Sequence, residues 1–204
     1  MEKMKMHIGE HYMMIGSTGS GKTYFARNFL LKQFSRVLVI DSEDMEFADY
    51  NQIKADPQNI ARKLPKDKNF HWRYVPDLIN AKQEMEYISQ SLLEYGHEVV
   101  IYIDEITDFS DAHSISPWLS ALIRKARKRK ISVIIATQRP QGVNKWLFNN
   151  SIWKQFFYIQ PFDLHYLDEL WKGISEIVSQ VSWKSYESVL ISPDGIVHRL
   201  EKVK

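Results

Sequence analysis

Eight consecutive residues have the composition and spacing of a phosphate-binding loop. They are Gly16, Ser17, Thr18, Gly19, Ser20, Gly21, Lys22 and Thr23, a complete G-x-x-x-x-G-K-[ST] pattern after the apolar run 12–15. The glycines let backbone N–H groups point inward around a triphosphate, and a helix that starts near Lys22 adds its positive end. We expect Lys22 to reach the β- and γ-phosphates and the Thr23 hydroxyl to bind Mg²⁺. The preceding strand and the following amphipathic helix argue against an unused glycine turn.

Two adjacent carboxylates follow the apolar strand expected at 99–103. Asp104 would hold Mg²⁺ through water, and Glu105 would orient and deprotonate an attacking water molecule. Acids at the end of a buried strand are common, so the catalytic interpretation depends on the phosphate loop upstream. The run 144–147, Asn-Lys-Trp-Leu, lacks the Asp with which small GTPases contact guanine, and this class is therefore disfavoured.

A third polar group comes at the end of the strand expected at 132–137, where the chain continues as Gln138-Arg139-Pro140. If this strand lies beside the Asp104 strand, the Gln138 amide points toward the γ-phosphate and can help to place the water. Spacing alone favours the plainer interpretation, a polar residue where a strand meets a proline-bounded loop.

Six of the seven residues in the run 124–130 are basic. At helical spacing, Arg124 and Lys128 point away from the apolar stripe, and Arg127 lies at its margin, one turn after Ile123. A solvated face is the usual meaning of such a run. A DNA-facing surface, or an arginine presented to a neighbouring subunit, are the alternatives. A second basic group lies among the aromatic residues of 62–73, and an ordinary surface loop is its plainer interpretation.

The elements that must position these groups form an α/β pattern, with a mostly parallel central sheet flanked by helices. The expected strands are 11–15, 37–40, 70–75, 99–103, 133–137 and 156–159. Helical periodicity is clearest over 77–95, and a second helix is expected over 117–130 with Pro117 at its first position. The segments 186–191 and 196–200 flank a Ser-Pro-Asp-Gly turn and predict a C-terminal β-hairpin.

Length and composition favour one compact unit. At 204 residues and a net charge of +2, we expect a single domain over 1–204, with a core at about 10–160 and C-terminal helices and hairpin at 161–204. The chain has no cysteine, which excludes disulfides and thiolate metal sites. The longest unbroken aliphatic or aromatic run is 99–103, far too short for a transmembrane segment. We expect a soluble, intracellular-type protein.

Three strings together resemble the FtsK/HerA superfamily of DNA-pumping ATPases. They are the phosphate loop, the Ile-Asp-Glu strand end at 103–105 and Ile-Ile-Ala-Thr-Gln-Arg-Pro at 134–140, and the match covers about 13–142. The last string is the most specific of the three. Because no membrane-anchoring or DNA-reading domain accompanies this core, the chain resembles the genome-packaging ATPases of internal-membrane viruses within that superfamily.

This resemblance implies a RecA-like P-loop NTPase that hydrolyses ATP with Mg²⁺ at the boundaries of a hexameric or pentameric ring around double-stranded DNA. It makes Gln138 a γ-phosphate sensor and Arg127 a finger that acts on the neighbouring subunit. It also implies a capsid or membrane-vertex partner, and a location in the host cytoplasm or at the packaging vertex of the virion. The family often has glycine where Lys130 stands, so the end of this helix is expected to differ.

Two other functions remain open at this stage. A nucleotide or nucleoside kinase also has a phosphate loop, although it would normally carry an arginine-bearing lid and would not need a water-activating Glu105. A nucleotide-dependent assembly switch with weak turnover is the other alternative.

Overall fold

The structure, a computed structural model, describes residues 4–42, 44, 46–183 and 186–201. In this part of the chain, nine strands form one sheet in the order β3-β4-β2-β5-β6-β1-β7-β8-β9. In this order, all the strands from β3 through β2 and β1 to β7 run parallel to one another. Strand β8 pairs antiparallel with β7, and β9 pairs antiparallel with β8. The strands are β1 (His11–Ile15), β2 (Arg36–Ile40), β3 (Asn51–Gln52), β4 (Phe70–Tyr74), β5 (Val99–Ile103), β6 (Ile131–Thr137), β7 (Trp153–Phe156), β8 (Ser188–Ile191) and β9 (Val197–Leu200).

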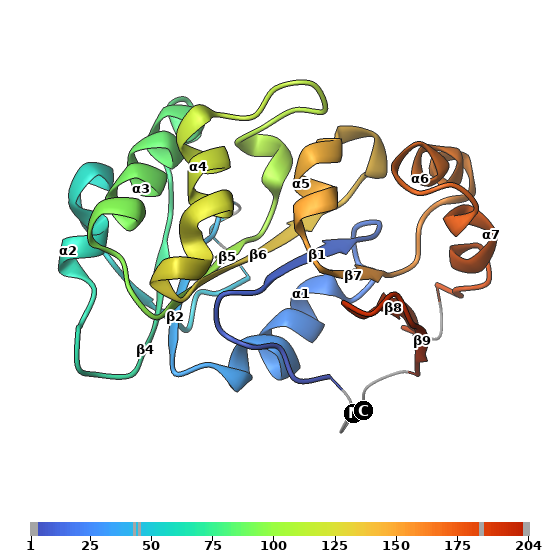
Figure 1. Ribbon diagram of the computed structural model, residues 1–204, viewed down its shortest axis with the longest axis horizontal. Coiled ribbons are helices and arrows are strands. Elements are labelled where there is room, and N and C mark those ends of the chain that lie inside the picture. Colours follow the sequence, from blue (N-terminus) through green and yellow to red (C-terminus); the bar gives the residue numbers. More distant parts are fainter. Residues whose placement is uncertain (1–3, 43, 45, 184–185, 202–204) are drawn as a thin grey trace.

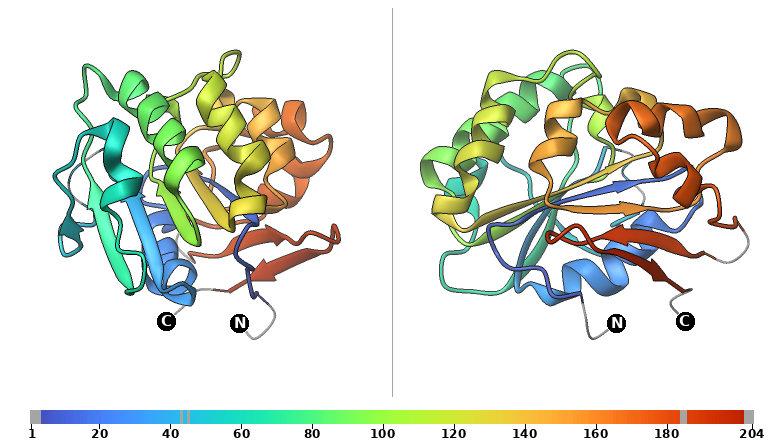
Figure 2. Two further views of the ribbon diagram at one scale, coloured as in Figure 1. Left: turned by 60° about the vertical axis from the view of Figure 1, so that its left-hand side comes forward. Right: turned by 45° about the vertical axis from the view of Figure 1, so that its right-hand side comes forward.

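Helices cover both faces of the sheet (Figures 1 and 2). They are α1 (Lys22–Phe25), α2 (Ile60–Lys63), α3 (Ala81–Tyr95), α4 (Pro117–Lys125), α5 (Lys145–Asn150), α6 (Leu164–Leu170) and α7 (Ile174–Val178). A π-helical turn (Ala26–Leu30) and a 3-10 turn (Leu31–Gln33) continue α1 and pack with it on one face, and the helices α2 to α7 pack on the other. The α/β architecture with a mostly parallel sheet and a C-terminal hairpin is confirmed. No helix among the described residues is both long and apolar enough to cross a membrane.

Strand alternation divides the apolar side chains between two cores. In β1, Met13 and Ile15 belong to the core under α3 and α4, whereas Tyr12 and Met14 belong to the core under α1. Successive side chains of a strand point to opposite faces, so a strand covered on both sides must be apolar at every position. All five residues of β1 are buried, and 12–15 satisfy this requirement, whereas His11 at the start of the strand is polar.

Two predicted boundaries are wrong. The strand expected at 156–159 lies earlier, as β7, because its pairing with β1 runs from Tyr12 opposite Trp153 to Ile15 opposite Phe156. Residues 157–159 continue past the sheet, where Tyr158 accepts a hydrogen bond from the N–H of Ser17. Helix α3 begins at Ala81 rather than 77, because an Asp77 turn precedes it and leaves Leu78 75% exposed instead of in the core.

The second predicted helix also ends early. Helix α4 stops at Lys125, a 3-10 turn follows at Ala126–Arg129, and Lys130 has the left-handed conformation with φ 54°. This conformation favours glycine, the residue that the resemblance led us to expect here. In this chain Lys130 keeps it while its ammonium group pairs with the Glu98 carboxylate at 2.5 Å.

A buried histidine ties the start of the sheet to α4. Nε2 of His11 hydrogen-bonds to the carbonyl of Ile123 at 2.9 Å, and its Nδ1 accepts from the N–H of Val133 at 3.1 Å. A neutral ring with its hydrogen on Nε2 satisfies both bonds. Burial lowers the pKa of His11 below its usual value, although the Ile123 carbonyl opposes this shift.

Acid should therefore weaken the fold through His11. Only the unfolded chain takes up this proton at mildly acidic pH, so the free energy of unfolding should fall below about pH 6.5, until the lowered pKa of the folded ring is reached. Urea unfolding between about pH 7.5 and 5.5 should show a smaller loss for the non-titrating variant His11→Asn than for the unmodified chain. Equal losses would contradict this assignment.

Candidate active site

The strand order brings the predicted site residues to one edge of the sheet. Strand β6 lies between β1 and β5, and all three run in parallel. The phosphate loop follows β1, Asp104 follows β5, and Gln138 follows β6. Because the carboxyl ends of parallel strands meet at the same edge, these three segments lie side by side there. The expectation that the Gln138 strand neighbours the Asp104 strand is confirmed.

The loop 16–23 is shaped to receive phosphate. Gly19 and Gly21 have φ of 72° and 100°, and among the described backbone hydrogen bonds none uses the N–H of Thr18, Gly19 or Gly21. The hydroxyl of Ser20 is buried without a hydrogen-bond partner. Lys22 donates from Nζ to the carbonyls of Gly16 at 2.6 Å and Ser17 at 3.2 Å. Inward N–H groups beside a folded-back lysine fit a bound polyphosphate.

Glu105 is fixed by hydrogen bonds on both carboxylate oxygens. Oε1 accepts from the Thr107 hydroxyl at 2.7 Å and from its N–H at 3.2 Å, and Oε2 accepts from the N–H of Gln138 at 2.9 Å. The residue is 8% exposed. A carboxylate held in one orientation, with lone pairs left to accept a proton, is suited to act as a general base.

Gln138 joins this carboxylate to the phosphate loop, with its backbone on one side and its side chain on the other. Its backbone contacts Glu105, and its Oε1 accepts a hydrogen bond from the Thr18 hydroxyl at 2.5 Å. The amide therefore lies against the loop, through a hydrogen bond that is open to solvent. This placement supports the phosphate-sensing interpretation over a merely polar strand end.

Asp104 and Thr23 meet at a third side chain, Tyr102. The Tyr102 hydroxyl donates to Asp104 Oδ1 at 2.6 Å and is also hydrogen-bonded to Thr23. Burial, and secondly the charge of Asp104, raises the pKa of Tyr102 well above its usual value, so the hydroxyl keeps its hydrogen. A carboxylate and a hydroxyl that share Tyr102 as a neighbour fit Mg²⁺, which usually binds one or two protein oxygens together with phosphate and water.

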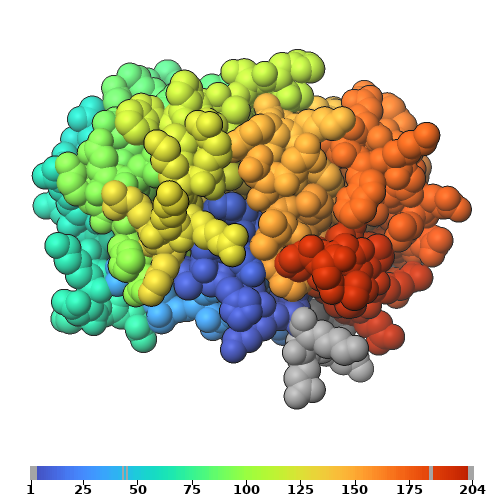
Figure 3. Space-filling view, viewed as in Figure 1, coloured from blue at the N-terminus to red at the C-terminus, as the bar shows by residue number. Residues whose placement is uncertain are grey.

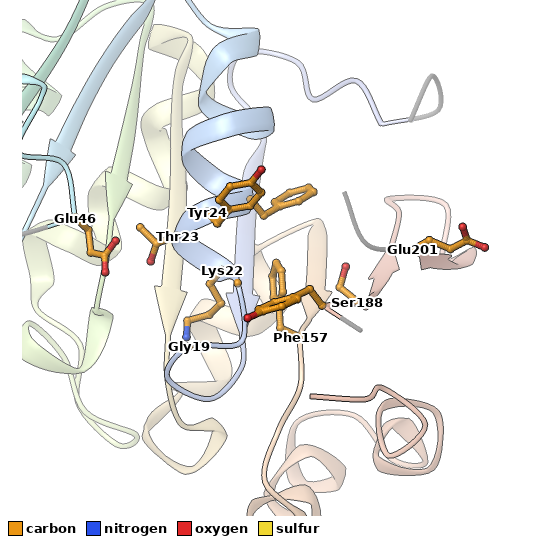
Figure 4. A pocket seen from close by; sticks show the side chains of 11 residues that line it. Gly19, Lys22, Thr23, Tyr24, Glu46, Phe157, Ser188 and Glu201 are labelled. Atoms are coloured by element: carbon orange, nitrogen blue, oxygen red, sulfur yellow. The ribbon is translucent and has the colours of Figure 1, made fainter. Parts of the chain in front are cut away.

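A cavity of about 680 Å³ adjoins the loop. Figure 4 shows Lys22 and Thr23 between Glu46 on one side and Phe157 and Ser188 on the other. The further lining residues are Gly19, Gly21, Tyr24, Phe25, Tyr186 and Glu201. The aromatic rings give the cavity flat apolar walls next to a phosphate-binding loop.

Arg127 lies at the opposite edge of the sheet from this site. A Cβ atom placed on Gly9 would lie 3.5 Å from Cγ of Arg127, and Gly9 precedes β1, whereas the phosphate loop follows it. A strand of five residues is about 17 Å long, far beyond the reach of an arginine side chain. In Figure 3 the yellow atoms around this position project beside the blue N-terminal segment. Arg127 therefore cannot act on the phosphates bound by its own chain.

Several side chains of the second basic group have partners within the protein. Arg73 is 11% exposed at its side chain and pairs with Asp41 at 3.3 Å and Asp44 at 2.6 Å. The guanidinium of Arg62 lies over the Tyr95 ring at 3.9 Å. Phe70 is buried in the core. These three side chains thus have structural partners, and Phe70 and Arg73 lie in β4 rather than in a surface loop.

Sequence reasoning missed two groups of site residues. Tyr102 and Thr107 hold the predicted carboxylates, and strand alternation could have identified Tyr102, since it lies two residues before Asp104. Trp183 and Tyr186 come from the C-terminal region, and a Cβ atom on Gly19 would lie 3.1 Å from the Trp183 ring. No local pattern connects these aromatic residues to a loop so distant in the sequence.

Comparison with known proteins found a phage protein with a similar sequence and several solved structures with a similar fold. No family model matches the chain. Protein P9 of Pseudoalteromonas phage PM2 is 27% identical over 148 residues, which are 71% of this chain and 66% of the phage protein. The match thus spans just under two thirds of the length of that relative.

Several solved structures share the fold over nearly the whole chain. The genome packaging NTPase B204 from Sulfolobus turreted icosahedral virus 2, in complex with ATP-gammaS, has a TM-score of 0.74 at 15% identity and covers 98% of this chain and 100% of its own. B204 from Sulfolobus Turreted Icosahedral Virus, described as a DNA-packaging ATPase, has a TM-score of 0.68 at 17% identity with the same coverage. VirB4 of Thermoanaerobacter pseudethanolicus has a TM-score of 0.64 at 14% identity and covers 95% of this chain and 89% of its own. The resemblance predicted from the three motifs is confirmed at the level of the fold: this chain has the P-loop ATPase fold of the viral packaging NTPases.

Proposed function

We propose that this chain is an ATP-hydrolysing motor that moves double-stranded DNA, and that it packages a viral genome into a preformed capsid. The observation that carries the proposal is the clamp on Glu105, whose carboxylate is bound by Gln138 and Thr107 beside the phosphate loop. A fixed base at this place activates water, so hydrolysis rather than transfer to a small acceptor is the supported reaction.

The nucleotide occupies the loop and the adjoining cavity in this proposal. Backbone N–H groups and Lys22 bind the phosphates, and Thr23 and Asp104 hold Mg²⁺, which neutralises phosphate charge when bound. The aromatic walls of the cavity, including Tyr24 and Tyr186, receive the base and the ribose. The shared fold with a structure solved with ATP-gammaS supports this choice of nucleotide.

A kinase and an assembly switch are less well supported. A kinase needs an acceptor site facing the γ-phosphate, yet Gln138 and Glu105 fill this side of the loop. A switch needs a nucleotide-sensing element but no fixed base, and the clamped Glu105 therefore favours steady turnover.

The position of Arg127 supports self-assembly if this residue takes part in catalysis. If it is a catalytic finger it must act on a neighbouring subunit, so we propose a ring of five or six copies with ATP at each boundary. The exposed basic residues of 124–130 at the amino edge of the sheet supply charge for DNA phosphates or for the neighbouring subunit. The motor would work in the host cytoplasm, or at the packaging vertex of the virion together with a capsid or membrane-vertex protein.

Steady-state ATPase assays with DNA test this proposal. Long double-stranded DNA should stimulate hydrolysis more than single strands or short duplexes, and the DNA affinity should fall steeply with salt and depend little on sequence. Displacement of a triplex-forming strand by the protein with ATP would demonstrate movement along the duplex. Phosphoryl transfer to a nucleoside, or turnover indifferent to DNA, would overturn the motor proposal, and negative-stain images with DNA would reveal a ring.

A further inference from the structure

One buried hydroxyl contacts both residues that are predicted to hold magnesium. Tyr102 lies in β5, fully buried, with its ring 5.3 Å from that of Phe47. Its hydroxyl donates to Asp104 at 2.6 Å, and the Thr23 hydroxyl lies beside it as a second partner. A phenylalanine would bury the same apolar ring, so the oxygen is the part of this side chain that packing does not explain.

The chemistry of the three groups fixes the direction of the two bonds. An ionised carboxylate can only accept, so the single hydroxyl hydrogen of Tyr102 goes to Asp104. Thr23 must then donate its own hydrogen to the Tyr102 oxygen. The relay therefore turns the Thr23 hydrogen away from the phosphate loop and leaves its oxygen lone pairs as the groups presented to a cation.

We propose that Tyr102 is a positioning residue for the metal part of this site. The relay from Thr23 through Tyr102 to Asp104 holds a hydroxyl and a carboxylate in the orientation that receives the Mg²⁺ of a bound nucleotide. Partners of this kind, one bond behind the metal ligands, set the orientation of the ligands and contribute to metal affinity. The inference rests on the proposed function and deepens it, because it concerns how the same nucleotide site binds its cation.

The Tyr102→Phe variant removes the relay and keeps the ring. The Mg²⁺ concentration that half-saturates binding of a fluorescent ATP analogue should rise by about 10-fold or more, the usual effect of losing such a partner. Binding of the analogue in EDTA should be unchanged, since the loop and Lys22 remain. Titration of Mn²⁺ by electron paramagnetic resonance, with the analogue present, gives a second readout that does not depend on hydrolysis.

Tyr12 provides the matched control. It is also fully buried on the same face of the sheet, on the far side of Ile134 in β6, and its hydroxyl donates to Gln155 at 2.7 Å, away from the predicted metal ligands. Tyr12→Phe should leave the Mg²⁺ requirement within about twofold of the unmodified chain. It thus measures what loss of a buried tyrosine hydroxyl does by itself.

The outcomes separate this inference from the proposed function. Equal Mg²⁺ requirements in the Tyr102→Phe and Tyr12→Phe variants would overturn the positioning role. The role would also be overturned if Tyr102→Phe weakened binding of the analogue in EDTA as much as it weakened binding with Mg²⁺. A second replacement, Tyr102→Met, gives the same comparison if the first variant does not fold. Metal-dependent binding without hydrolysis in the unmodified chain would overturn the motor alone, whereas absence of metal-dependent binding would overturn both.

Discussion

The Glu105→Gln variant is expected to bind ATP with magnesium like the unmodified chain and to hydrolyse it at least about 10² times more slowly. The amide can fill the position of the carboxylate, because its carbonyl can accept from the N–H of Gln138 and its NH₂ group can donate to the Thr107 hydroxyl, although the N–H of Thr107 then loses its acceptor. The fold and the phosphate loop are then retained, and what is lost is a group that can take a proton from water.

Lys22→Ala, in contrast, should affect nucleotide binding and turnover together. Lys22 supplies the cationic side chain of the phosphate loop, so its removal should weaken nucleotide binding as well as turnover. Fluorescent nucleotide titration and phosphate release, measured on both variants, distinguish the two roles. Glu98→Gln is the matched control, because Glu98 lies just before β5, at the other end of the strand that Glu105 follows. Loss of binding to the same extent in the Glu105 and Lys22 variants would contradict the assignment.

The sequence could predict the sheet and the residues at its carboxyl edge because both depend on short-range patterns. Strand β1 is apolar from position 12 to 15, and the loop that follows it has a fixed spacing of glycines, Lys22 and Thr23. Parallel strands place their carboxyl ends together, so Asp104, Glu105 and Gln138 had to lie near this loop once β5, β6 and β1 were neighbours.

Features that depend on long-range packing could not be predicted in this way. The apolar run at 156–159 reads as a strand, yet pairing with β1 selects Trp153–Phe156 and leaves Phe157 to pack under the phosphate loop. The side chains above the loop, such as Trp183, come from the far end of the sequence. Which of several apolar stretches pairs, and which covers a site, is decided by tertiary contacts.

The position of Arg127 limits how this residue could act in hydrolysis. Spacing left a solvated charge, a DNA contact and a trans-acting finger as alternatives, and the resemblance favoured the last. In the structure Arg127 packs beside Gly9, a full strand length from the phosphate loop of its own chain. An effect of Arg127 on hydrolysis would therefore require a neighbouring subunit.

Arg127→Ala should leave the monomer folded and able to bind ATP, yet lower turnover by about 10³-fold, the magnitude typical of such fingers. The planar guanidinium can contact γ-phosphate oxygens in the transition state, and alanine offers no replacement. Arg124→Ala is the matched control, since Arg124 is an exposed arginine one turn earlier in the same helical segment. Equal losses in the two variants, accompanied by weaker DNA binding, would identify the whole run as a DNA contact.

Mixed assemblies give the decisive test of a finger that acts across the subunit boundary, because they place the Arg127→Ala and Glu105→Gln substitutions on different subunits. Arg127→Ala subunits keep Glu105, and Glu105→Gln subunits keep Arg127, so some boundaries in a mixed ring receive one intact group from each side. Activity should therefore partly return on mixing two preparations that are each nearly inactive. Fluorescence energy transfer between differently labelled subunits would establish that they assemble together. Co-assembly without recovery would exclude a catalytic role of Arg127 across the boundary, and the basic run would then be a solvated or DNA-binding surface.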